Sequence, residues 1–333
     1  MTVAANSRKY LKRIAWGLAL VAAVAIAAFA WKRASAPAVA SVVEYAMLEP
    51  RDTPTALAIG PDGTVWFTID FAAAIGRVRD GRVERLPKPR ISLEPVGIAV
   101  TPDGAAWFTD AEARQVSRMA LSGEISSITL DTPVARLGKV AAAADGSVWF
   151  SEATAYSITR VKDGKLKRHV IDSVRGGPLG VAVAPDGSVW ATLQGANQLL
   201  RIAADGRMST FDIPTRSSSP ADIAVGADGS VWFLEFRGNK IGRFADGRFE
   251  EFPAGEQSAG LTGLAVAPDG SVWFGMLRKG SLGRLRDGKI EELKLPREGA
   301  RPYGVAVDPA GNVWYTDITG YVGMLKAEAA KKP

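Results

Sequence analysis

Apolar and polar residues follow the same order in seven successive segments of the chain, and the unit returns every 41 or 42 residues. In each copy a short apolar run leads into a turn, most often Pro-Asp-Gly, and a second apolar run follows. The second runs contain Trp66, Trp107, Trp149, Trp190, Trp232, Trp273 and Trp314. Asp-Gly turns between apolar runs predict β-hairpins. The pattern therefore predicts a repeat protein made of β-strands.

Each copy holds four apolar runs, which we expect to be four strands. Residues 180–183 are an example of the first run, and residues 82–86 are an example of the fourth. Four short strands in about 40 residues indicate a β-propeller blade, because a solenoid would carry shorter or helical repeats. The recurring tryptophans are expected to pack between blades. An arginine follows eleven residues after each of the first six tryptophans, and we expect it to bridge neighbouring blades or cap strands.

The two ends of the repeat region predict how the ring closes. The last copy stops after its third strand, near residues 321–326. Residues 42–48 precede the first copy and match the fourth-strand pattern of residues 248–252 and 289–293. Pairing of this segment with the last blade would remove an exposed edge. The predicted fold is all-β: a seven-bladed propeller over residues 42–326, followed by a disordered tail at residues 327–333.

A different pattern precedes the propeller. Residues 14–31 form an uninterrupted apolar run with Trp16 and Trp31 at its ends, and four of the basic residues lie before it. As a helix of about 1.5 Å per residue this run would span a bilayer core. We expect a basic cytoplasmic N-terminus at 1–13, a transmembrane signal anchor at 14–31 and a linker at 32–41. The positive-inside bias predicts a single-pass protein of the inner membrane with its propeller in the periplasm or outside the cell. The alternative is a secreted protein cleaved near Ala36.

Charge and composition exclude two classes of function. The net charge is +6, but residues 1–36 contain six basic residues and no acidic one. The propeller is therefore neutral overall, without the basic surface of a nucleic-acid-binding protein. The chain has no cysteine, which excludes disulfides and thiolate chemistry.

Candidate binding residues are those that break the repeat on the face around the central channel. Three places past the tryptophans stand four acids, and polar residues occupy the neighbouring loops. The predicted binding rim consists of Asp110, Glu152, Glu235, Asp317, Arg114, Arg237, Asn239, Tyr303 and Arg301. Converging carboxylates can hold Mg²⁺ or Ca²⁺. They can equally be solvated loop ends that pair with the nearby arginines.

The repeated Pro-Asp-Gly, Trp-Phe and Ile-Gly-Arg elements resemble the virginiamycin B lyase family, the streptogramin lyases, over about residues 42–326. More distantly they are similar to NHL-repeat and SMP-30/gluconolactonase propellers. The resemblance implies a Mg²⁺-assisted elimination that opens a cyclic lactone antibiotic. In that family a histidine in a Pro-His-Gly segment acts as the base, and a second histidine and two glutamates assist.

This chain departs from the family pattern at each of those positions. Tyr303 stands for the catalytic histidine, Arg301 and Ile318 for the glutamates, and Thr262 for the second histidine. The one histidine of the chain, His169, falls in the outer strand of the third blade and cannot substitute. Phenols titrate about three units above neutral pH, and a cation at position 301 would repel Mg²⁺.

Two functions remain open at this point. The first is a non-catalytic module that binds a ligand, glycan, peptide or protein at the mouth of the propeller. The second is a divalent-metal-dependent lyase or lactonase whose site is rebuilt from the acids of the rim. The replaced family positions favour the first.

Overall fold

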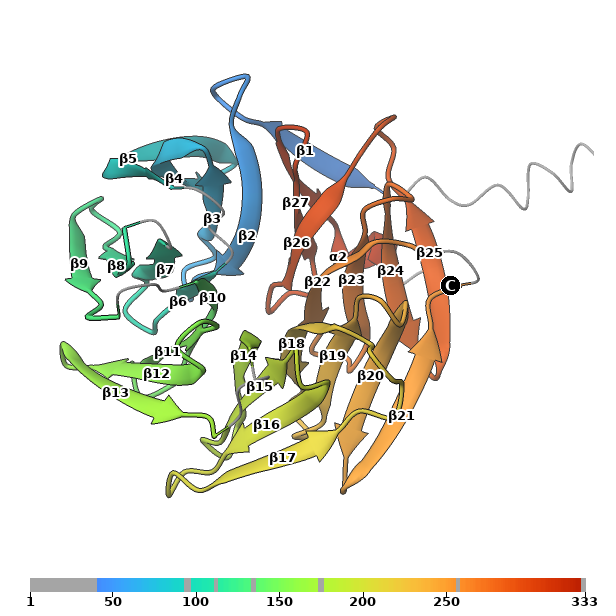
Figure 1. Cartoon of the computed structure of the whole chain (residues 1–333). Coiled ribbons are helices and arrows are strands. Elements are labelled where there is room, and N and C mark those ends of the chain that lie inside the picture. The colour runs from blue at the N-terminus through green and yellow to red at the C-terminus, as the bar shows by residue number, and fades with distance from the viewer. Residues whose placement is uncertain are drawn as a thin grey trace, which may run out of the picture. The chain divides into compact units, whose positions relative to one another are not determined.

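Each copy of the repeat forms one four-stranded antiparallel sheet, and seven such sheets surround a central channel (Figure 1). The computed structural model describes residues 41–92, 97–110, 113–132, 136–172, 177–255 and 258–330. The predicted cytoplasmic segment 1–13, the signal anchor 14–31 and residues 32–40 of the linker lie outside these residues. Within the described part of the chain, no helix has the length and apolar character needed to cross a membrane.

The strands of each blade follow one another from the channel outward. Blades one to three consist of β2 (Thr53–Ile59), β3 (Val65–Asp70), β4 (Ala72–Arg79) and β5 (Arg82–Ser92); β6 (Ile98–Val100), β7 (Ala106–Asp110), β8 (Gln115–Met119) and β9 (Ile125–Thr129); and β10 (Leu137–Ala142), β11 (Val148–Glu152), β12 (Ser157–Lys162) and β13 (Lys165–Val170). Blades four and five consist of β14 (Pro178–Val183), β15 (Val189–Leu193), β16 (Gln198–Ile202) and β17 (Met208–Asp212); and β18 (Pro220–Val225), β19 (Val231–Glu235), β20 (Lys240–Ala245) and β21 (Arg248–Pro253). Blades six and seven consist of β22 (Leu261–Val266), β23 (Val272–Met276), β24 (Ser281–Arg286) and β25 (Lys289–Lys294); and β26 (Pro302–Val307), β27 (Val313–Asp317), β28 (Tyr321–Leu325) and β1 (Val42–Ala46).

The tight turn between the first two strands of a blade is held by its aspartate. In blade four the Asp186 carboxylate accepts hydrogen bonds from the Ser188 amide and hydroxyl, at 2.9 and 2.6 Å. Gly187 has a φ of 78°, a left-handed conformation that glycine adopts without steric cost. This local chemistry explains why the Asp-Gly pair recurs.

The recurring tryptophans pack between blades, as predicted. Trp273 of blade six, for example, belongs to a buried cluster with Val305, Val313 and Tyr315 of blade seven. Burial of such rings at each blade contact supplies much of the stabilisation of the ring. The last tryptophan, Trp314, packs in the same way against the first blade.

The recurring arginines have a different main role from the one that the sequence suggested. Each stands directly opposite the tryptophan of its own blade, as Trp149 does with Arg160. In blades one, three, four, five and six the arginine lies over the tryptophan ring. Its guanidinium carbon is between 5.3 and 5.9 Å from the ring centroid, a cation–π arrangement. Arg160 also pairs with Asp145 in the hairpin turn of the same blade, at 2.7 Å. Contacts to the next blade also occur, since Arg77 donates to the Leu121 carbonyl.

The predicted closure of the ring is confirmed. β1 pairs antiparallel with β28, with Val42 opposite Leu325, so the blue N-terminal strand completes the red last blade (Figure 1). Arg297, in the loop after blade six, ties this strand in place because it contacts Glu44 at 3.2 Å and Asp317 at 2.5 Å. The tail was expected to be disordered, but it begins with one helical turn, α2 (Ala327–Ala330). The Ala327 amide there donates to the side chain of Asn312.

Candidate functional site

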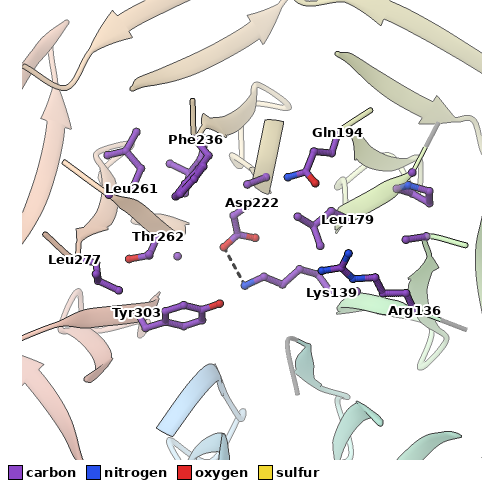
Figure 2. A pocket seen from close by; sticks show the side chains of 18 of the residues that line it. Arg136, Lys139, Leu179, Gln194, Asp222, Phe236, Leu261, Thr262, Leu277 and Tyr303 are labelled. Carbon is purple, nitrogen blue, oxygen red and sulfur yellow. Dashed lines mark hydrogen bonds and ion pairs between the residues drawn. The ribbon is translucent and has the colours of Figure 1, made fainter. Parts of the chain in front are cut away.

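A cavity of about 840 Å³ opens at one end of the central channel, between the inner strands and loops of blades three to seven (Figure 2). Its walls are mostly apolar, with Leu179, Leu261, Leu277 and Phe236 among the lining side chains. A concave, apolar space of this size with a few polar groups is typical of a small-molecule site.

In each blade, one residue at the bulge of the innermost strand faces the channel at the level of this cavity. The pairing of the first two strands shifts there by a bulge, as between Pro178 and Val181 in blade four. The residues at this position in the seven blades are Ala56, Gly97, Lys139, Gly180, Asp222, Gly263 and Gly304. At Gly180 a β-carbon would lie 2.4 Å from the Ala221 carbonyl of the next blade, so small residues allow the inner strands to approach. Blades three and five alone carry charged side chains there.

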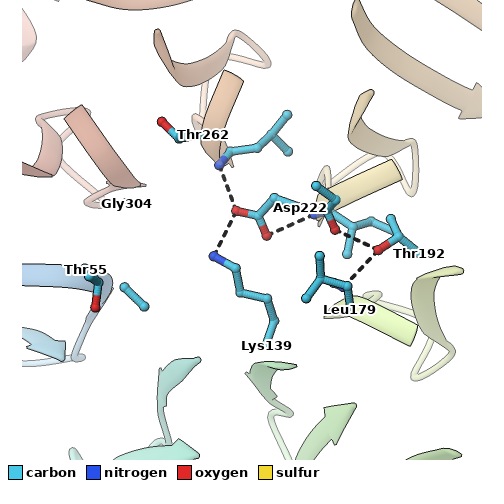
Figure 3. Close-up of polar contacts among 12 residues, drawn as sticks. Thr55, Lys139, Leu179, Thr192, Asp222, Thr262 and Gly304 are labelled. Atoms are coloured by element: carbon cyan, nitrogen blue, oxygen red, sulfur yellow. Dashed lines mark hydrogen bonds and ion pairs between the residues drawn. The ribbon is translucent and has the colours of Figure 1, made fainter. Parts of the chain in front are cut away.

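These two side chains meet across the channel. Lys139 Nζ lies 3.3 Å from Asp222 Oδ2, although the residues are 83 positions apart (Figure 2). The Asp222 carboxylate is also held by the amides of Ile223 and Leu264, each at 3.1 Å (Figure 3). The pair therefore links blades three, five and six at the floor of the cavity.

The Lys139 ammonium stays charged in this setting. Burial by itself would lower the Lys139 pKa, but the nearby Asp222 carboxylate and Tyr303 outweigh it and raise the pKa above its ordinary value. Tyr303 lines the cavity beside the pair (Figure 2).

Three further cations surround the mouth. Arg136, Arg278 and Arg301 line the cavity and are exposed. Within the described residues none of these three guanidinium groups takes part in a recorded ion pair, whereas the arginines of the tryptophan series do. Among the described residues that line the cavity, Asp222 is the only carboxylate, so this part of the lining carries four positive charges and one negative charge.

The four rim carboxylates of the sequence prediction lie outside the cavity lining and are buried. Asp110 pairs with Lys88 at 3.3 Å, Glu152 with Arg168 at 3.0 Å, and Asp317 with Arg297 at 2.5 Å. In blades three to six the residue that lines the cavity is the one four places past the tryptophan. The residues at that place in blades three to six are Ala153, Gln194, Phe236 and Leu277.

Glu235 is the exception among the four. It is fully buried, and neither carboxylate oxygen has a hydrogen-bond partner within the described residues. Burial, reinforced by the charge of Glu251, raises the pKa of Glu235 to about 7, and Lys240 offsets only part of this shift. Glu235 therefore titrates near neutral pH in the interior of the propeller.

The carboxylates do not form a metal-binding cluster in the part of the chain that the structure describes. No three His, Asp or Glu residues there lie close enough together to hold an ion. Binding of Mg²⁺ or Ca²⁺ stays a prediction from the sequence.

Comparison with known proteins identifies the relatives of this propeller. The model of the virginiamycin B lyase family matches residues 34–193 and 130–331, which together span the whole propeller. The chain belongs to the virginiamycin B lyase family.

Individual relatives agree with this membership. A curated virginiamycin B lyase of Nocardia farcinica (strain IFM 10152) is 36% identical over 165 residues, which cover 48% of this chain and 55% of the relative. The match thus spans about half the length of that relative. A catalytically inactive virginiamycin B lyase of Staphylococcus aureus, solved with quinupristin, superposes with a TM-score of 0.81 at 26% identity, covering 86% of this chain and 99% of that chain. A streptogramin B lyase structure gives 0.80 at 25% identity, covering 85% and 96%.

The positions on which the family relies meet in part at the cavity. Tyr303, Arg301 and Thr262 line it, whereas Ile318 does not. Thr262 donates its hydroxyl to the Pro302 carbonyl, so it joins blades six and seven. Among these four side chains there is no carboxylate and one is a cation, so this donor set does not fit Mg²⁺.

The remaining predicted rim residues are not part of the lining. The Asn239 side chain links the turn between β19 and β20 to the connection between blades five and six, because it donates to the Gly255 carbonyl and accepts from the Ala259 amide. Arg114 reaches the Thr132 carbonyl, and Arg237 is likewise absent from the cavity wall. His169 lies in β13, as expected, and its ring packs against Trp149. Sequence reasoning missed Lys139 and Asp222, although two opposite charges at a position otherwise held by glycine or alanine are a readable signal.

Proposed function

We propose that this protein is a ligand-binding propeller of the virginiamycin B lyase family and that it does not carry out the elimination of the lyases. The observation that carries the proposal is the chemistry of the cavity lining. A lactone elimination needs a general base that is free to take a proton near neutral pH. The charged groups among the described lining residues are guanidinium groups, an ammonium that is held protonated, and a carboxylate already engaged by Lys139 and two amides.

The divalent-metal lyase or lactonase is the weaker alternative. It requires acids that converge on an ion, and Asp110, Glu152 and Asp317 each have a cationic partner of their own. A carboxylate so paired would have to release its partner before it could bind a metal, at the cost of a buried, unpaired charge.

We propose further that residues 14–31 anchor the chain in the membrane and that the propeller lies outside the cytoplasm. The support is the length of the apolar run and the basic residues that precede it. A binding module in this location would meet solutes or partners before they enter the cell.

Incubation of the purified full-length chain with quinupristin and Mg²⁺ tests the absence of lyase activity. We expect no linearised product by mass spectrometry at a rate comparable to a family lyase, because loss of a general base alone costs about 10²–10⁴-fold. Rapid Mg²⁺-dependent linearisation that Tyr303→Phe abolishes would show that the site has been rebuilt and that the protein is an enzyme.

A further inference from the structure

The charges of the central cavity select a class of ligand, an inference that rests on the proposed binding function. We propose that the cavity binds an amphipathic organic anion, with its carboxylate at Lys139 and its apolar body against the leucines and Phe236.

The first support is the imbalance of charge. Arg136, Lys139, Arg278 and Arg301 line a cavity in which Asp222 is the only acid among the residues that the structure describes. Cations gathered around a concave site with apolar walls raise the local concentration of anions, because the low-dielectric surroundings focus their field. A surface arginine in isolation would carry no such meaning, but the propeller as a whole is neutral and these four cations share one opening.

The second support is the state of the Lys139 ammonium. It can donate three hydrogen bonds, and one contact, to Asp222, is recorded within the described residues. Its side chain is 23% exposed, and it points into the space that a ligand would occupy (Figure 2). Asp222, by contrast, is held by the amides of Ile223 and Leu264 and keeps its orientation when Lys139 turns to a ligand.

The third support is the distribution of apolar surface. Leu179, Leu261 and Leu277 lie around the polar floor, and Phe236 is 42% exposed although it is a large aromatic side chain. An exposed aromatic ring at the mouth of an apolar cavity offers a contact for the body of a ligand. The arrangement therefore fits a molecule with one anionic end and a compact hydrophobic body.

Three probes of the same shape test the sign of the charge. We would measure the binding of 2-naphthoate, 2-naphthamide and 2-naphthylmethylammonium to the full-length chain in a nonionic detergent by titration calorimetry. We expect 2-naphthoate to bind about tenfold or more tightly than the amide, since a hydrogen bond to a charged group is worth that much. Its affinity should fall with added salt.

Variants of the ion pair give the decisive comparison. Asp222→Asn releases the ammonium from its competitor, and we expect the affinity for 2-naphthoate to rise several-fold. The double variant with Lys139→Met and Asp222→Asn should bind it about tenfold more weakly than the wild type. Arg82→Gln removes an exposed positive charge at an outer turn that does not line the cavity, so it serves as the matched control and should leave the affinity unchanged.

Two results would overturn the inference in different ways. Equal binding of the amide and the carboxylate, or tighter binding of the ammonium, would refute an anion site while leaving a ligand-binding propeller intact. Failure of all three probes to bind would refute this ligand class, and the quinupristin assay would then decide separately whether the protein is an enzyme.

Discussion

Glu235→Gln should stabilise the propeller above neutral pH. In the folded chain the Glu235 carboxyl is buried, neither of its oxygens has a hydrogen-bond partner among the described residues, and its pKa rises from 4.5 to about 7. The folded state therefore holds the proton more tightly than the unfolded state does. The penalty is absent below the unfolded value, grows as the pH rises from about 4.5 to about 7, and is constant above that range.

The magnitude follows from the shift. Each unit of pKa difference is worth about 1.4 kcal/mol, so ionised Glu235 costs on the order of 3 kcal/mol at pH 8. Glutamine has nearly the same shape and stays neutral. The free energy of unfolding of Glu235→Gln should therefore exceed that of the wild type by up to about 3 kcal/mol at pH 8, and the difference should vanish near pH 4.5.

Urea unfolding followed by tryptophan fluorescence at several pH values measures this difference. Glu152→Gln is the matched control, because Glu152 holds the equivalent place in blade three but accepts a hydrogen bond from Arg168 at 3.0 Å. That change should destabilise the chain by about 1–3 kcal/mol, since it weakens a charge-assisted contact. Parallel pH profiles for wild type and Glu235→Gln would show that Glu235 ionises as an ordinary glutamate and would refute the reasoning.

Three further predictions concern the closure of the ring and the N-terminal segment. A chain that starts at Pro50 lacks β1 and should melt at a clearly lower temperature than one that starts at Ser41; equal melting temperatures would contradict the role of closure. Arg297→Met leaves the buried Asp317 carboxylate without its cation and should cost about 3 kcal/mol of stability by urea unfolding, whereas Arg79→Met, at an exposed turn, should cost little. A C-terminal reporter that works only outside the cytoplasm should be active and membrane-bound; a soluble periplasmic product would instead indicate cleavage near Ala36, and activity of a cytoplasm-specific reporter would reverse the orientation.

The fold could be predicted because its signals are local and repeated. The Asp-Gly turns specify the hairpins, and the seven tryptophans count the blades. The segment Val42–Ala46, which precedes the first repeat, supplies the missing strand of the blade that contains Trp314. The role of the arginines was less clear from the sequence. The spacing of eleven residues alone does not show that the two side chains touch. Their contact follows from the strand register, which places Arg160 opposite Trp149.

The site was harder to predict because it depends on which residue of a strand end faces the channel. Glu152 and Ala153 are adjacent, yet the first is buried against Arg168 and the second lines the cavity. An error of one residue exchanges the two, since neighbouring strand residues point to opposite sides. Lys139 and Asp222 lie two blades apart in the ring, and their contact follows from the curvature of the whole propeller. The sequence shows that two charged residues replace glycine or alanine, but it does not show that they form an ion pair.

The pairing of β1 with β28 also sets the order of events during synthesis. Val42 leaves the ribosome early, but its partner Leu325 belongs to the last strand of the chain. At about 5–20 residues per second, the roughly 280 residues between them take on the order of 15 s to a minute to translate. Throughout that interval β1 has no partner strand, and the growing array of blades has open edges. Completion of the ring is therefore a late, long-range step. A chain truncated before residue 321 lacks β28 and could not close the ring.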